Sequence, residues 1–302
     1  MTKKGKDGLG LTLTDTSTML AEPPCCVLYA RPGFGKTTQL AQCFSDALWL
    51  VTNKGTLRPY AHWCMRNRET VEKLGLRTLQ KPNPKWKPKQ KSDTPAYLAE
   101  MRTWEEGGMA MKVIPEFMPD NKTRVDNRTL IREIVYRFSS ARQEGTCPYN
   151  GLVFDEGTEF ARRFHAEMEA DSGIKGGFAV WTALEDYLRW LFQVPRGADC
   201  FMGFLCHERA PKYDDREGSP TAGQLQYVGG PSLPSGSIRG ALSGICDVLL
   251  RGVVRPGLDG PKRIWQTQIS REWDSKIRSF NVDAEEETNL RELLTKAGYR
   301  LS

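Results

Sequence analysis

Nine residues near the start of the chain have the types and spacing of a triphosphate-binding loop. Ala30–Thr38 reads Ala-Arg-Pro-Gly-Phe-Gly-Lys-Thr-Thr and follows an apolar run typical of a buried strand. Glycines at positions 33 and 35 would let backbone N–H groups converge on an anion, and the N-terminus of a following helix would add partial positive charge. The strict pattern has glycine in place of Ala30, but the later residues all match. We therefore predict a P-loop, the alternative being an ordinary glycine-rich turn before a lysine.

The side chains of this loop predict separate roles. Lys36 would reach the β- and γ-phosphates, and the Thr37 hydroxyl would ligate Mg²⁺. The expected ligand is therefore ATP with Mg²⁺. The other residues expected to hold the nucleotide are Arg31, Pro32, Gly33, Phe34, Gly35 and Thr38.

A second apolar run ends on two acids. Gly151–Asp155 is typical of a buried strand, and an acid at the tip of a parallel strand near the P-loop can hold Mg²⁺. We predict this role for Asp155. Glu156, the next residue, could polarise the attacking water as a general base. Glu159 lies one turn further on, and an ordinary acid at a helix start is the other interpretation of Glu156.

Two further sites could complete a catalytic centre. His207 follows the apolar run Phe201–Cys206, so it would stand at a strand tip and sense the γ-phosphate. The alternative is a partly buried structural histidine. Lys276 and Arg278 could be cations delivered to the nucleotide of a neighbouring subunit, as an arginine finger is. A solvated basic face would also explain this pair.

The elements that must position these residues alternate between strand and helix. Apolar runs predict further strands, and helical periodicity predicts the helices between them. This order predicts an α/β fold with a mainly parallel central sheet flanked by helices. The expected strands are Cys25–Ala30, Ala47–Thr52, Gly151–Asp155, Phe201–Cys206, Ile245–Val254 and Arg263–Ile269, and the expected helices are Lys36–Ser45, Arg128–Arg142, Phe178–Phe192 and Glu285–Ala297. In the third helix, Phe178, Trp181, Leu184, Leu188 and Leu191 predict a core-facing stripe.

The chain divides into one main domain and its extensions. Residues 1–22 resemble a flexible lead, 23–281 the main domain, and 282–302 a closing helix. Within the main domain, about 58–127 is expected to be a basic insertion, because prolines and glycines interrupt its periodicity. The stretch Ala210–Ser237 is rich in glycine, proline and serine and is longer than an ordinary connection, so we expect a functional loop there.

Composition limits the class of protein. The chain has 302 residues and a net charge of +6, a mild bias that is compatible with a polyanionic partner. Its eight cysteines contain no Cys-x-x-Cys pair, which favours buried reduced thiols over disulfides or zinc. No apolar run is long enough to cross a bilayer and no signal-peptide layout opens the chain, so we expect a cytoplasmic protein, in the host cytoplasm if it is viral, with no membrane partner.

Two segments combine positive charge with aromatic rings. Lys81–Lys91 holds five lysines around Trp86, a pairing that suits single-stranded nucleic acid. The Ala210–Ser237 loop adds Lys212, Tyr213, Arg216 and Tyr227. A solvated, lysine-rich loop is the alternative for the first segment.

The motifs together resemble those of the phage-type, single-domain RecA-like ATPases linked to single-strand annealing and recombination. The resemblance spans about Pro24 to Ser279 and rests on Tyr29–Thr38, Leu152–Glu156, Phe204–Glu208, Gly230–Pro234, Cys246–Arg251 and Lys276-x-Arg278, in the family's order. It implies a RecA-like core, a homo-oligomer with nucleotide between subunits, and DNA as partner. The chain has Asn53-Lys54-Gly55 where such proteins often carry an acid, which leaves base catalysis to Glu156.

Three functions remain open at this point. The leading hypothesis is an ATP-driven protein of DNA recombination or repair that is encoded by a phage, as the resemblance implies. A genome-packaging or translocating motor could use the same core in a ring. A nucleotide-binding assembly protein without significant turnover is the third, and a small-molecule kinase is disfavoured because no compact acceptor lid is evident.

Overall fold

The computed structural model describes residues 23–52, 55–78, 110–113, 127–171, 173–174, 177–234, 240, 244–279 and 281–301. In these ranges ten strands form one sheet, ordered β12-β10-β9-β1-β5-β4-β2-β3, with β11 paired to β9 and β8 paired to β5. The strands are β1 (Cys25–Ala30), β2 (Leu48–Val51), β3 (Ala110–Val113), β4 (Gly151–Asp155), β5 (Phe201–Arg209), β8 (Gly230–Pro231), β9 (Val248–Arg255), β10 (Lys262–Gln266), β11 (Lys276–Ile277) and β12 (Glu285–Glu287).

The sheet is parallel through its centre. β3, β2, β4, β5, β1 and β9 run in one direction, while β10 and β12 add an antiparallel edge. This confirms the predicted α/β fold with a mainly parallel sheet. In this sheet β5 lies between β1 and β4 and runs parallel to both of them. The carboxyl ends of β1, β5 and β4 therefore meet at one edge, the place where open α/β sheets bind ligands.

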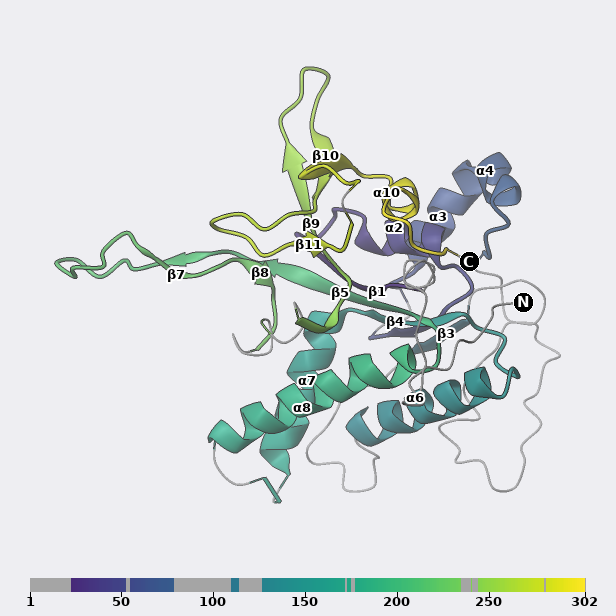
Figure 1. Ribbon diagram of the computed structural model, residues 1–302, viewed down its shortest axis with the longest axis horizontal. Coiled ribbons are helices and arrows are strands. Elements are labelled where there is room, and N and C mark those ends of the chain that lie inside the picture. The colour runs from purple at the N-terminus through teal and green to yellow at the C-terminus, as the bar shows by residue number, and fades with distance from the viewer. Residues whose placement is uncertain are drawn as a thin grey trace, which may run out of the picture.

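Helices cover both faces of this sheet (Figure 1). Alternate residues of β1 enter two different cores, with Val27 and Tyr29 on one face and Leu28 and Ala30 on the other. Three helices pack on the first face: α6 (Asn127–Gln143), α7 (Gly157–Ala170) and α8 (Gly177–Arg196). The second face carries α2 (Lys36–Cys43), α3 (Arg58–Arg66) and α10 (Leu290–Lys296), with α4 (Arg68–Lys73) following α3.

Within the predicted loop Ala210–Ser237, residues 210–234 are more regular than we expected. They include a hairpin of β6 (Lys212–Tyr213) and β7 (Leu225–Tyr227), which projects from the body of the protein (Figure 1). After the hairpin, β8 pairs with Glu208 and Arg209. That pairing extends β5 three residues beyond Cys206, so His207 lies inside the strand and not at its tip. We call residues 210–229 the arm.

Two predictions at the helices are wrong. The expected helix Glu285–Ala297 begins only at Leu290, because its first three residues form β12 against β10. There Glu287 pairs with Lys262 at 2.7 Å, and Glu285 pairs with Arg255. Phe178 does not join the core face of α8, since its side chain is 87% exposed.

The region expected to be an insertion contributes to the main fold. It begins with α3 and α4, and its residues Ala110–Val113 add β3 to the sheet beside β2. Lys81–Lys91, Asn53, Lys54 and the lead at 1–22 lie outside the described residues. All eight cysteines are free thiols, and seven of them are buried. Among the described residues, no helix is long and apolar enough to cross a membrane.

A buried ring fixes the start of α2 to the edge of the sheet. Phe34 is 4% exposed and meets Trp265 of β10 edge-on, with ring centroids 4.7 Å apart. The ring also lies over Gly252 of β9, where an added Cβ would stand 2.5 Å from a ring carbon. Gly252 is therefore a glycine because the aromatic ring occupies the space of a side chain.

We expect Gly252→Ala to lower the free energy of unfolding by about 1–3 kcal/mol, because Phe34 cannot move without disturbing Trp265. Urea unfolding followed by circular dichroism would measure this. Gly177→Ala is the control, since nothing lies within 4 Å of a Cβ built there. Equal stability of the two variants would show that the Phe34 ring is free to shift.

Candidate nucleotide-binding site

The loop between β1 and α2 has the backbone shape that an anion site needs. Gly33 and Gly35 have φ angles of 80° and 102°, in the left-handed region that side chains disfavour. Gly35 is the N-cap of α2, and no side chain caps the helix there. The first N–H groups of α2 are consequently left for a ligand.

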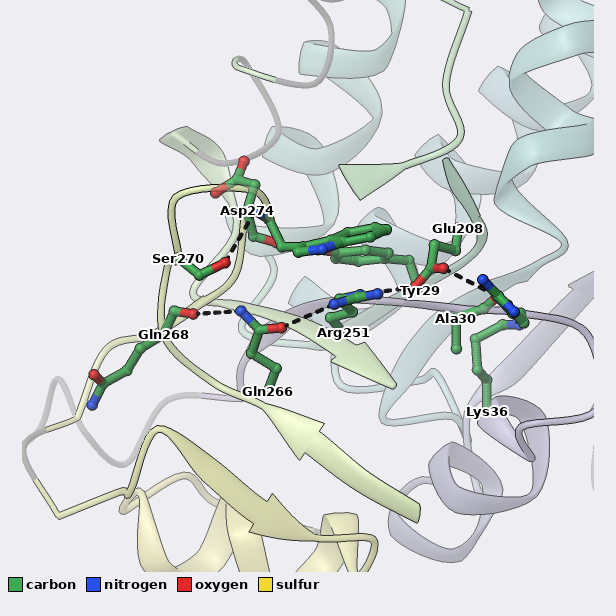
Figure 2. Close-up of polar contacts among 11 residues, drawn as sticks. Tyr29, Ala30, Lys36, Glu208, Arg251, Gln266, Gln268, Ser270 and Asp274 are labelled. Atoms are coloured by element: carbon green, nitrogen blue, oxygen red, sulfur yellow. Dashed lines mark hydrogen bonds and ion pairs between the residues drawn. The ribbon is translucent and has the colours of Figure 1, made fainter. Parts of the chain in front are cut away.

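Lys36 lies at the start of α2 and turns back toward the loop. Its Nζ donates to the carbonyl oxygen of Ala30 at 3.1 Å (Figure 2). Burial lowers the pKa of Lys36, although the nearby Asp155 carboxylate opposes this shift. A bound polyphosphate would supply the negative charge that this half-buried ammonium group lacks.

Thr37 and Asp155 join the P-loop to β4. The Thr37 hydroxyl donates to Asp155 Oδ2 at 2.7 Å, across the intervening strand β5. Burial raises the pKa of Asp155 to about 7, and the neighbouring Glu156 carboxylate also raises it. A hydroxyl beside a desolvated carboxylate is a donor set that fits Mg²⁺, which accepts oxygen ligands and would favour the ionised form.

The Glu156 side chain contacts His207 of β5. His207 Nε2 lies 3.2 Å from Glu156 Oε1, and both side chains are partly exposed. The His207 backbone N–H donates to the Thr158 hydroxyl at 3.0 Å, which ties β5 to the start of α7. The buried Nδ1 of His207 has no hydrogen-bond partner within the described part of the chain. The structure thus brings the predicted base and the predicted sensor together.

Glu159 is less suited to act as a base. Its carboxylate accepts from Arg162 Nε and Arg163 Nε, each at 2.8 Å. These hydrogen bonds lower the pKa of Glu159 to about 2. Of the two acids that the sequence offered, Glu156 directly follows Asp155 and has no arginine partner among the described residues.

The other loop residues differ in what they can contribute. Arg31, Pro32 and Gly33 are exposed, and Thr38 is partly buried in the first turn of α2. Phe34 points into the core, so only its main chain is left to contact a nucleotide.

Sequence reasoning missed the ionic network behind the loop. Glu208 at the end of β5 lies between two arginines, with Arg31 Nε at 3.5 Å and Arg251 Nε at 2.8 Å. Figure 2 shows the contacts continuing from Arg251 to Gln266 and on to Gln268. The guanidinium of Arg251 also lies 3.1 Å from the ring centroid of Trp273. A charged residue inside the apolar run of β9 was the available signal for this network.

Arg278 is the predicted residue that stands apart. It follows β11, and its Nη1 pairs with Asp247 Oδ1 at 3.3 Å. Asp247 directly precedes β9 and accepts from the backbone N–H of Cys25, the first residue of β1. Arg278 therefore lies at the amino edge of the sheet, opposite the P-loop of its own chain.

A cleft of about 970 Å³ opens on the other side of the P-loop from Asp155. It separates the loop from the β9–β10 hairpin, and its lining carries several cations. The charged residues on the lining are Arg31, Glu208, Arg251, Lys262, Arg263 and Glu287.

A family model and a solved structure are similar to this chain. The family model described as "AAA domain" matches residues 22–279. Among solved structures, the chain is similar to that of a KaiC-like protein from the hyperthermophilic archaeon Pyrococcus horikoshii, with 12% identity and a TM-score of 0.38, covering 85% of this chain and 84% of that one. No curated protein matches significantly. The strand order, with β5 between the P-loop strand and the acid-bearing β4, is that of a RecA-like P-loop core, as the resemblance implied.

We expect Glu208→Gln to lower the free energy of unfolding by about 2 kcal/mol, because it leaves the buried Arg251 without its carboxylate. Both side chains are largely buried, at 6% and 14% exposure. Chemical denaturation would measure the change. Glu185→Gln removes an exposed pair with Arg189 on α8 and should cost under about 0.5 kcal/mol. A similar small loss in both variants would mean that Gln266 and Trp273 suffice to hold Arg251.

Proposed function

The chain belongs to a family of AAA domains, and from this premise we propose that it binds ATP with Mg²⁺ at Gly33–Thr38 and hydrolyses it. The observation that carries the proposal is the hydrogen bond between Thr37 and Asp155. It places a P-loop hydroxyl and a strand-tip carboxylate side by side, with Glu156 as the next residue. ATPases of this kind need these three groups at one sheet edge.

The described residues divide the work as follows. Backbone N–H groups at the start of α2 hold the phosphates, and Lys36 leaves the Ala30 carbonyl to contact them. Thr37 and Asp155 hold Mg²⁺, which when bound neutralises charge that develops on the phosphates. Glu156 accepts the proton of the attacking water, and His207 orients the Glu156 carboxylate through their contact.

We expect Glu156→Gln to retain ATP binding and to lower kcat at least about a hundredfold, because the base is lost while the phosphate contacts remain. Phosphate release and calorimetric titration would measure the two effects. Glu159→Gln, in the first turn of α7, is the control and should keep kcat within about twofold.

Lys36→Ala should instead lose ATP binding, since a half-buried cation facing the phosphates disappears. If Glu159→Gln loses as much turnover as Glu156→Gln, the assignment of the base is wrong. Wild-type protein that binds no ATP would refute the proposed function as a whole.

We propose that the partner is DNA, with single strands favoured. The protein would then act in DNA recombination or repair and would be encoded by a phage. The net charge supports a polyanionic partner, and the distribution of charge along the sequence favours a contact outside the arm. The arm and the residue before it carry three cations, Arg209, Lys212 and Arg216, and three acids, Asp214, Asp215 and Glu217. Lys81–Lys91, by contrast, contributes five lysines and no acid to a chain whose net charge is +6. The sequence of that segment, with Trp86, is therefore the stronger support for DNA contact.

We expect single-stranded DNA to stimulate ATP hydrolysis, and the stimulation to fall as salt rises because phosphate contacts release counterions. Replacing the five lysines of 81–91 by glutamine should abolish the stimulation and leave the basal rate unchanged. Lys212→Gln, on the arm, is the control and should change little. Stimulation that survives loss of all five lysines would remove this segment from the DNA interface. Preference for duplex with directional movement would favour a motor instead.

We also propose a homo-oligomer with nucleotide between subunits. Arg278 is 53% exposed at the sheet edge remote from its own P-loop, so a nucleotide that it contacts belongs to a neighbouring copy. Light scattering with ATP and DNA present tests this, and a strictly monomeric protein would refute it.

A further inference from the structure

Arg263 of β10 lies over the P-loop, although none of the motifs in the sequence includes it. It is two residues before Trp265 on β10, so the two side chains leave the strand on the same face. Trp265 packs against Phe34 of the P-loop. Arg263 Nη1 stands 3.9 Å from the position of a Cβ built on Gly35. The guanidinium thus reaches the N-cap of α2 from outside.

The Arg263 side chain has no charged partner within the described part of the protein. Arg263 is exposed and makes no hydrogen bond or ion pair with the described residues. The nearby acids of β12 are taken by other cations, since Glu285 pairs with Arg255 and Glu287 with Lys262. An arginine held over a helix N-terminus, where the macrodipole is positive, is in an electrostatically unfavourable place unless an anion joins it.

The residues on the two sides of the P-loop indicate which way a bound nucleotide would be oriented. Thr37, Asp155 and Glu156 mark the side of the metal and the attacking water, and therefore of the terminal phosphate. The cleft with Arg263 opens on the opposite side, against β9 and β10. A nucleotide that places its terminal phosphate near Asp155 must direct its inner phosphate and nucleoside into this cleft.

We propose that Arg263 is a nucleotide-binding residue that contacts the inner phosphates shared by ATP and ADP. This inference rests on the proposed function and adds a cation from the same chain to the site. Arg263 acts on affinity and not on the hydrolytic step, because it lies on the side of the loop away from Glu156.

Calorimetric titration with ATP and with ADP tests the proposal. Arg263→Ala should weaken both ligands by about tenfold or more, the loss expected when a charged hydrogen bond to phosphate is removed. Arg263→Lys should recover part of the affinity, because it keeps the charge without the planar fork. Arg255→Ala removes a cation from the same hairpin outside the cleft lining and should leave both dissociation constants unchanged.

Other outcomes would overturn the proposal in distinct ways. Loss of ATP affinity with ADP affinity intact would place Arg263 at the terminal phosphate. Equal losses in Arg263→Ala and Arg255→Ala would reduce the effect to general charge. Unchanged affinity in Arg263→Ala would make Arg263 a solvated surface residue. Failure of the wild-type protein to bind either nucleotide would instead refute the proposed function. Where the variants turn over, kcat at saturating ATP should stay constant while KM rises.

Discussion

The seating of Phe34 between Gly252 and Trp265 is the contact on which the rest of the site depends. It places a loop residue in the hydrophobic core, so the loop cannot move independently of β9 and β10. The N–H groups around it are thereby held where an anion can meet them. The same contact turns one face of β10 toward the loop, which is why Arg263 reaches Gly35. One aromatic ring thus fixes both the phosphate cradle and the opposite wall of the cleft.

Two ionisable groups of the site, Lys36 and Asp155, would each be stabilised by a ligand of opposite charge. Lys36 and Asp155 are desolvated, and burial shifts both pKa values toward the neutral forms. The attraction between the two groups, and the hydrogen bond from Thr37 to Asp155, oppose these shifts but do not cancel them. Phosphate oxygens beside Lys36 and a divalent cation beside Asp155 would remove both penalties together. Binding of the two ligands is then expected to be mutually reinforcing.

Local sequence patterns predicted the centre of the fold. Features that depend on pairing between distant segments, such as the length of β5 and the strand β12, were not predicted. The strand, loop and helix from Cys25 to Cys43 follow from glycine positions and apolar runs that lie close together in the chain. The extension of β5 depends on β8, some twenty residues later, and so His207 was placed at a strand tip. Three consecutive glutamates read as helix, yet Lys262 and Arg255 on a neighbouring hairpin hold them as β12. Arg263 belongs to no motif, and only the packing of Trp265 reveals its direction.

β5 connects the site to the arm in a way that neither element shows alone. Its last residues carry His207 and Glu208, and the chain then continues directly into the arm. At the base of the arm, Gly229 forms a bridge with Trp273, whose ring lies against Arg251, the partner of Glu208. Arg31 of the P-loop contacts the same Glu208 carboxylate. Arg31, Glu208, Arg251 and Trp273 therefore form one continuous series of contacts from the P-loop to the base of the arm.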